Sequence, residues 1–344
     1  MESRMIKDGA IAGLTRTSRE AIVFMVVAFA TSPLAAAPPR YTDWSAPQNL
    51  GNTVNSSFQD LGPAISKDGR SLYFVSNRPG GVGDFDIWVS QRASEHSPWE
   101  QPVNLGPRIN TTAQDGVPSL SRDGHWLFFN SNRPGGYGGV DVWASYRFDK
   151  HDDFGWQLPV NLGPEVNTAF LDQGAFLFEN DDDGGALLFF GSDRTGGTGA
   201  LDIYVSEQMS DGSFGPPTIV RELSTPQNDQ RAMVRRDGLE LFLFSDRTGT
   251  FGLADIWVST RESEDQPWST PVNLGSTVNS AFADAHPYLS SDRESLFFAS
   301  NRTGNYDLYV TTRSKVKRHE CAKRLCAARD RDDDDDRGHD DDDD

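Results

Sequence analysis

Residues 60–90 read DLGPAISKDGRSLYFVSNRPGGVGDFDIWVS, and this stretch decides the fold because it recurs four more times along the chain. The other copies begin at Asp115, Asp172, Asp229 and Asp284. Self-similarity with a period of a few tens of residues is typical of solenoids and propellers, in which each repeat is one supersecondary unit.

Each copy predicts three strands. In the first copy, a strand from residue 60 runs into the turn Asp68-Gly69, and an Asp-Gly pair between apolar runs is a strong hairpin signal. The second strand, SLYFVS, is almost wholly apolar, which indicates burial on both faces. A glycine-rich turn then leads into the third strand, DIWVS.

A second motif between the copies supplies a fourth strand. It reads WSAPQNLG, WEQPVNLG, WQLPVNLG, FGPPTIVREL and WSTPVNLG, starting at Trp44, Trp99, Trp156, Phe214 and Trp268. Four strands per repeat, buried on both faces, are typical of a propeller blade. Since one such motif precedes the first copy and none follows the last, we expect the N-terminal strand near residues 44–50 to pair beside residues 307–312. This closure removes an exposed sheet edge. The prediction is an all-β, five-bladed β-propeller of four-stranded antiparallel blades over residues 38–313.

The two ends of the chain differ from this body. A basic lead, the apolar run AIVFMVVAFA at 21–30 and small residues predict a signal peptide over residues 1–37, with an uncleaved leader as the alternative. The run is too short to cross a bilayer, so we expect a periplasmic or secreted protein without a membrane span in the mature chain. Residues 314–344 are basic and then almost purely aspartate, which predicts a disordered tail. Cys321 and Cys326 in that tail allow a local disulfide.

The composition excludes some classes of function. The chain has 51 Asp and Glu against 32 Lys and Arg, a net charge of −19, which argues against a nucleic-acid partner. Two cysteines in 344 residues exclude a fold built on disulfides. We expect a monomer.

The repeat resembles the TolB-type, WD-repeat-like periplasmic β-propeller repeat. The resemblance covers residues 41–313 and rests on the pattern LGxxVNxxxxDxxPxxSxDGxxLxFxSNRxGGxGxxDIWVS. It is especially similar to the form that is fused to OmpA-like envelope domains, and this sequence departs from that form by lacking an OmpA-like domain. The resemblance implies binding and scaffolding in the cell envelope.

One aspartate per copy stands at the start of the first strand, where propeller geometry places it near one mouth of the central channel. These candidate ligand-binding residues are Asp60, Asp115, Asp172, Asp229 and Asp284. A ring of carboxylates needs a nearby cation, Arg or N–H groups to stay ionised. A cation or cationic ligand is one interpretation; the alternative is that each Asp caps backbone donors. No cofactor is expected apart from calcium as a candidate, and no metal ligands are assigned. Arg78 and Asp86, with their repeats, are predicted to pair at the base of one hairpin.

Two residues after each of these aspartates the copies differ. The position holds Gly62, Val117, Gly174, Arg231 and His286. We predict that Arg231 and His286 form a ligand-binding patch at the channel mouth, beside Asp229 and Asp284; the alternative is ordinary surface charge. In the third copy, Asp181, Asp182 and Asp183 form an acidic turn whose spacing does not match an EF-hand.

These observations predict an exported, non-catalytic propeller that binds an envelope protein or a saccharide. The alternative is a glycosidase-like enzyme that uses channel aspartates, because glycosidases work with pairs of carboxyl groups. Against the alternative, no copy has an unmatched Glu where the first strand begins, and no catalytic motif such as GxSxG or HExxH occurs.

Overall fold

A computed structural model describes residues 41–179 and 185–316. The predicted signal peptide, almost all of the tail and the acidic turn at Asp181–Asp183 lie outside the described residues. The chain divides into Met1–Pro39 and Arg40–Asp344, and the second unit contains every described residue. Among these residues there is no helix long and apolar enough to cross a membrane.

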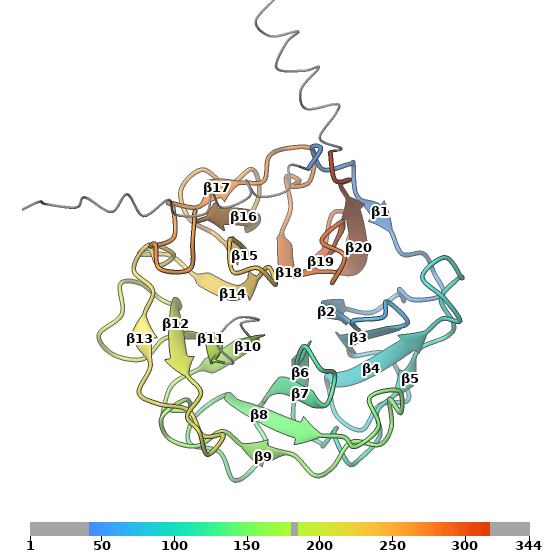
Figure 1. Cartoon of the computed structure of the whole chain (residues 1–344). Helices are drawn as coiled ribbons and strands as arrows, with labels where there is room; N and C mark the ends of the chain where they lie inside the picture. Colours follow the sequence, from blue (N-terminus) through green and yellow to red (C-terminus); the bar gives the residue numbers. More distant parts are fainter. Residues whose placement is uncertain (1–40, 180–184, 317–344) are drawn as a thin grey trace, which may run out of the picture. The chain divides into compact units, whose positions relative to one another are not determined.

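The described residues form five antiparallel sheets of four strands each, arranged around a common axis (Figure 1). Blade one contains β2 (Asp60–Ile65), β3 (Ser71–Ser76), β4 (Asp86–Gln91) and β5 (Val103–Asn104). Blade two contains β6 (Asp115–Leu120), β7 (Trp126–Ser131), β8 (Asp141–Tyr146) and β9 (Val160–Asn161). Blade three contains β10 (Asp172–Glu179), β11 (Ala186–Ser192), β12 (Asp202–Glu207) and β13 (Thr218–Ile219). Blade four contains β14 (Asp229–Val234), β15 (Glu240–Ser245), β16 (Asp255–Thr260) and β17 (Val272–Asn273). Blade five contains β18 (Asp284–Leu289), β19 (Ser295–Ser300), β20 (Asp307–Thr312) and β1 (Gln48–Asn49).

The ring closes through the N-terminal strand, as the sequence predicts. β1 pairs antiparallel with β20, with Gln48 opposite Val310. The side chain of Asn49 donates to the Asp307 carboxylate at 2.9 Å, and Asn104 of blade one makes the same contact with Asp86 at 3.0 Å. The first segment of the described chain therefore replaces the outer strand that the last repeat lacks.

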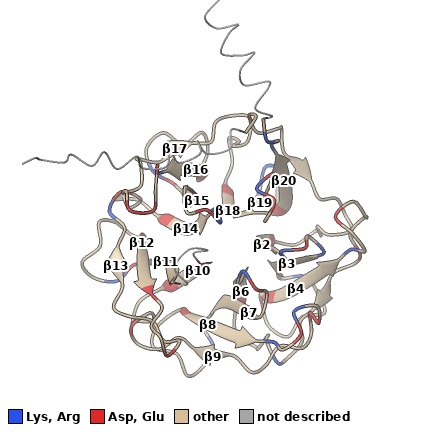
Figure 2. Cartoon of the chain, viewed as in Figure 1, with Lys and Arg blue, Asp and Glu red and all other residues tan. Residues whose placement is uncertain are grey.

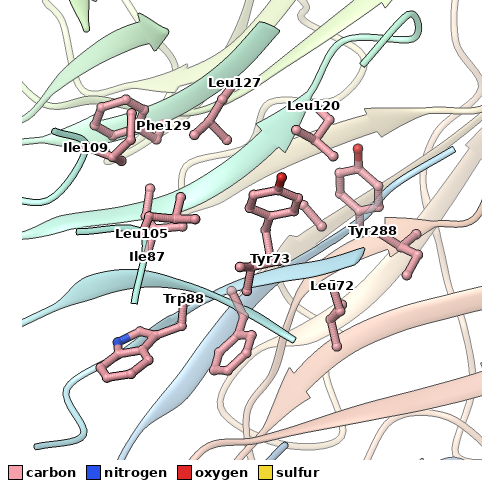
Figure 3. Packing of buried hydrophobic residues seen from close by; sticks show 14 of the residues in the cluster. Leu72, Tyr73, Ile87, Trp88, Leu105, Ile109, Leu120, Leu127, Phe129 and Tyr288 are labelled. Atoms are coloured by element: carbon pink, nitrogen blue, oxygen red, sulfur yellow. The ribbon is translucent and has the colours of Figure 1, made fainter. Parts of the chain in front are cut away.

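The core lies between the blades. The apolar second strands are buried on both faces; in β3, Leu72, Tyr73 and Phe74 have no exposed surface. Tyr73 belongs to the same packed cluster as Leu127 of β7 (Figure 3), so this cluster joins blade one to blade two. Fully burying one large apolar side chain stabilises a fold by about 1.5–3 kcal/mol. Charged residues lie mainly at strand ends and in loops (Figure 2).

Each innermost strand contains a bulge at its third residue. The pairing register shifts there in all five blades. The third residues all have positive φ, between 51° and 65°: Gly62, Val117, Gly174, Arg231 and His286. A Cβ on Gly62 would lie 3.3 Å from the Cα of Val117 in the next blade. Bulges re-aim side chains, and these five residues meet around the axis.

Candidate functional site

The five ring aspartates are enclosed by their own blades. Asp60 is fully buried. Its Oδ1 accepts a hydrogen bond from Arg78 Nη2 at 2.5 Å, and its Oδ2 accepts from the backbone N–H and the hydroxyl of Ser56 at 2.6 and 2.9 Å. The other four blades repeat the Arg contact and the backbone contact.

This geometry corrects the predicted hairpin pair. Arg78 binds Asp60, not Asp86. Asp86 instead accepts hydrogen bonds from Gly83 N at 3.1 Å and from Asn104 Nδ2 at 3.0 Å. Because Asp60, Asp115, Asp172, Asp229 and Asp284 are each fully buried with an arginine of their own, no surface of theirs faces a ligand. Their contacts match the alternative in which each carboxylate caps backbone donors.

Arg231 lies inside the ring, not at its mouth, whereas His286 keeps part of its surface exposed. Arg231 is only 3% exposed, and its Nη2 donates to the carbonyl oxygens of Pro63 and Pro118 at 2.8 and 3.0 Å. Its guanidinium also lies 5.8 Å from the centre of the Tyr288 ring. The side chain therefore crosses from blade four to blades one and two and fills the channel. The predicted patch beside Asp229 and Asp284 does not form, because Arg231 is buried and donates to these carbonyl oxygens of other blades.

Burial shifts the pKa values of both residues. Loss of solvation lowers the pKa of Arg231 to about 10. Loss of solvation, followed by the charge of Arg231, lowers the pKa of His286 to about 3. His286 is therefore neutral at physiological pH, and its ring packs 4.7 Å from that of Phe244.

An open cavity lies at the end of the axis where the innermost strands finish. This axial cavity encloses about 680 Å³, including solvent at its mouth. Its apolar lining includes Phe176 and Tyr288, whose rings meet edge to face at 6.2 Å. Each blade contributes to the lining the residue seven positions after its ring aspartate. These five rim residues are Lys67, Arg122, Glu179, Arg236 and Ser291.

A second cavity adjoins the first over blades two and three. This lateral cavity encloses about 670 Å³, including open solvent, and is lined by polar groups that include Asp123 and Gln208. Lys67, Arg122 and Glu179 line both cavities. The two spaces therefore meet at these three rim residues.

Glu179 is the carboxyl group of the rim. It ends β10, is half-buried, and accepts a hydrogen bond on Oε2 from the backbone N–H of Arg122 at 2.6 Å. Burial raises the pKa of Glu179, and the charge of Asp123 adds to this increase. Asp123 is exposed, and its Oδ1 accepts from Ser121 Oγ at 2.6 Å and from His125 N at 2.9 Å. The pair thus consists of a half-buried carboxyl group with a raised pKa and an exposed carboxyl group.

The sequence contained a signal for this site. The rim position holds Lys, Arg, Glu, Arg and Ser in the five copies, so only the third copy places a carboxyl group there. Function on a repeat scaffold is expected where the copies differ, and this difference lies at the end of the innermost strand opposite to the ring aspartate. In the described part of the chain, no group of three or more His, Cys, Asp or Glu side chains is placed to hold a metal ion.

Neither a protein-family model nor a curated protein matches the chain. Solved structures do. An α-L-arabinofuranosidase from Lactobacillus brevis is 16% identical, with 74% of this chain and 90% of that chain covered and a TM-score of 0.54. The catalytic domain of the Coprinopsis cinerea GH62 α-L-arabinofuranosidase is also 16% identical, with 80% and 98% covered and a TM-score of 0.53. The chain shares the fold of these glycosidases.

The similarity to a putative TolB from Agrobacterium tumefaciens is more distant. The identity is 15%, 79% of this chain and 84% of that chain are covered, and the TM-score is 0.45. Most of the similar solved structures are glycoside hydrolases. The expectation of a non-catalytic envelope scaffold as the leading interpretation is therefore wrong.

Proposed function

We propose that this chain is an exported carbohydrate-active enzyme that hydrolyses a glycosidic bond at the rim of the axial cavity. The observation that carries the proposal is the pair of Glu179, whose pKa is raised by burial, and Asp123, whose charge adds to that shift. Glycosidases usually carry out hydrolysis with two carboxyl groups that lie in different environments. The proposed export rests on the leader at residues 1–37, and the monomeric state stays a prediction.

Glu179 acts as the general acid. Its raised pKa extends the pH range over which the carboxyl group carries the proton that the leaving oxygen receives. Asp123 acts as the base: it takes a proton from a water molecule whose oxygen bonds to the anomeric carbon while the bond to the leaving oxygen breaks. The leaving oxygen gains the proton from Glu179, and solvent returns both carboxyl groups to their starting states.

The other rim residues suit a saccharide. Lys67 and Arg122 line both cavities and place cationic N–H donors near the two carboxyl groups. Hydroxyl-rich ligands accept hydrogen bonds from such donors, and a few convergent polar groups beside an apolar floor are typical of small-molecule sites. A saccharide was one of the two partners that the sequence predicts.

The test is hydrolysis of a panel that contains aryl α-L-arabinofuranosides, arabinan and β-1,3-galactan. Glu179→Gln and Asp123→Asn are each expected to lower the rate by about 10²–10⁴-fold, the usual contribution of an acid or base. Glu165→Gln, at an exposed carboxylate away from the cavities, is the control and should keep full activity. Wild-type activity should fall as pH rises through the raised pKa of Glu179. Turnover that survives both substitutions would reject the assignment.

A further inference from the structure

Glu179 stands on the wall that the axial and lateral cavities share. The groups that line only one cavity differ in kind. Phe176 and Tyr288 line the axial cavity only, whereas Asp123 and Gln208 line the lateral cavity only. The proposed acid is therefore common to both spaces, and the proposed base faces one of them.

Because the proposed acid lines both cavities and the proposed base lines only one, the two cavities can be assigned to different sugar units of the substrate. An acid that protonates a glycosidic oxygen must lie beside the bond that breaks, with one sugar unit on each side of it. The base must approach the anomeric carbon, so it lies on the side of the unit that is attacked. Because Asp123 lines only the lateral cavity, the attacked unit belongs there.

We propose that the substrate is an oligosaccharide that occupies both cavities, with the attacked unit in the lateral cavity and the leaving unit in the axial cavity. This inference rests on the proposed function and adds to it the direction of the chain and a minimum length of two sugar units.

The linings agree with this direction. In the lateral cavity, Lys67, Arg122, Asp123 and Gln208 surround the attacked unit with hydrogen-bonding groups. In the axial cavity, Phe176 and Tyr288 give the leaving unit an apolar surface.

The axial cavity has a closed floor. Arg231 bridges to Pro63 and Pro118, and Phe176 packs against Tyr288 beneath the cavity. A saccharide therefore does not thread the channel and leaves the axis at the rim, where Lys67, Arg122 and Glu179 join the axial cavity to the lateral cavity.

The experiment is calorimetric binding to the Glu179→Gln variant, which retains the site and is expected to turn over slowly. The probes are two series of one to four units, β-1,3-galacto-oligosaccharides and α-1,5-arabino-oligosaccharides. In the series that binds, the dissociation constant should fall at least tenfold between one and two units. Gln208→Ala, introduced into this variant, should weaken binding of one and two units alike, while Arg293→Gln, at the axial cavity, should weaken only two units and longer.

The outcomes separate the two proposals. Equal dissociation constants for one and two units, together with turnover by the wild type, would overturn this inference and leave the proposed function standing. An effect of Gln208→Ala confined to two units and longer would reverse the assigned direction and also overturn it. If neither series binds and the wild type hydrolyses nothing in the panel, the proposed function fails first. The melting temperature of each variant should match the wild type within a few degrees, which confirms that the site is tested in a folded protein.

Discussion

Arg78 Nη2 donates to Asp60 Oδ1 at 2.5 Å and thereby ties the turn after β3 to the start of β2. The same arginine donates to the carbonyl oxygen of Val54 at 2.7 Å, so one guanidinium holds the entry to the blade as well as its first strand. Side-chain exposure is 12% for Arg78 and zero for Asp60, so the charge of the aspartate is neutralised within the fold.

The first prediction concerns this repeated pair. Arg78→Met leaves the buried Asp60 carboxylate without its cation, and breaking a buried ion pair from one side costs about 3–5 kcal/mol. Urea unfolding should show a loss of that size in the free energy of unfolding.

The control is Arg70→Met, at an exposed arginine of the same blade, with an expected change within about 0.5 kcal/mol. The double variant Arg78→Met with Asp60→Asn should recover part of the loss because the uncompensated charge is gone. Equal effects of Arg78→Met and Arg70→Met would show that the pair is dispensable.

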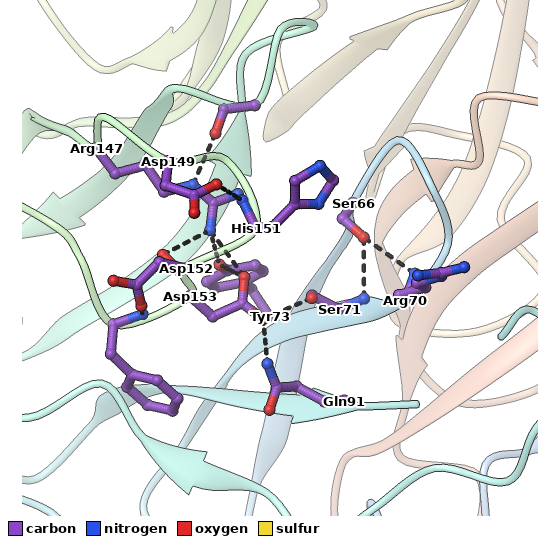
Figure 4. A network of polar contacts seen from close by, with 12 residues as sticks. Ser66, Arg70, Ser71, Tyr73, Gln91, Arg147, Asp149, His151, Asp152 and Asp153 are labelled. Carbon is purple, nitrogen blue, oxygen red and sulfur yellow. Dashed lines mark hydrogen bonds and ion pairs between the residues drawn. The ribbon is translucent and has the colours of Figure 1, made fainter. Parts of the chain in front are cut away.

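The second prediction concerns the contact between blades one and two. The Asp153 carboxylate accepts from Arg147 Nη1 at 2.8 Å, Tyr73 Oη at 2.5 Å, Ser71 Oγ at 2.6 Å and Gln91 Nε2 at 2.7 Å (Figure 4). Arg147 and Asp153 are both 2% exposed. Asp153→Asn is expected to cost about 3–5 kcal/mol, because the buried Arg147 loses its counterion.

Removing one neutral donor from the same network should cost less. Burial, reinforced by the charge of Asp153, raises the pKa of Tyr73 well above its usual value, so its hydroxyl stays protonated and donates. Tyr73→Phe is expected to cost about 1–3 kcal/mol, and Asp149→Asn, in the exposed part of the same loop, about 0.5 kcal/mol or less. A ranking other than Asp153, then Tyr73, then Asp149 would contradict this account of the network.

The third prediction tests the closure of the ring. Gln48 of β1 is paired with Val310 of β20, and cross-strand partners lie about 4.5–5.5 Å apart at Cα, within reach of a disulfide. Gln48→Cys with Val310→Cys, in a background with Cys321→Ser and Cys326→Ser, should oxidise readily. The bond should then stabilise the protein by about 2–4 kcal/mol, as measured by urea unfolding with and without reductant.

A register control accompanies it. Gln48→Cys with Thr312→Cys places the second thiol two residues further along β20, so it should cross-link slowly and without stabilising the fold. Equal cross-linking of both pairs would mean that β1 has no fixed register on β20, and the proposed closure of the ring by β1 would then be wrong.

The five-bladed architecture could be predicted from the sequence because it depends on the period of the repeats. The apolar run SLYFVS and its copies specify strands buried on both faces, and the unmatched segment at Trp44 specifies how the ring closes. These are properties of spacing and hydrophobicity, which a sequence displays directly.

The partners of individual side chains were harder to predict from the sequence because they depend on the local path of the backbone. Arg78 lies between Asp60 and Asp86 in sequence, and only the three-dimensional path of the hairpin directs it to Asp60 instead of Asp86. The bulge at Arg231 turns a residue expected at the mouth into the channel. Glu179 could not be assigned to a site from the sequence, because the convergence of five strand ends on one cavity is apparent only in three dimensions.

The last prediction concerns pH and His286. Its pKa is lowered to about 3 in the folded protein, whereas an unfolded His titrates near 6.5. Between these values the unfolded chain binds a proton that the native state does not, so stability is lost as pH falls from about 6.5 toward 3. One such group contributes a slope of about 1.4 kcal/mol per pH unit.

His286→Gly is expected to remove this part of the pH dependence, and glycine already occupies the equivalent positions at Gly62 and Gly174 with positive φ. Arg231→Met removes the positive charge beside His286. The pKa of His286 should therefore rise, which an NMR titration would detect. The exposed His96→Gln serves as the matched control. If His286→Gly and His96→Gln give the same stability profile between pH 4 and 7, then His286 is not the residue that links protonation to unfolding.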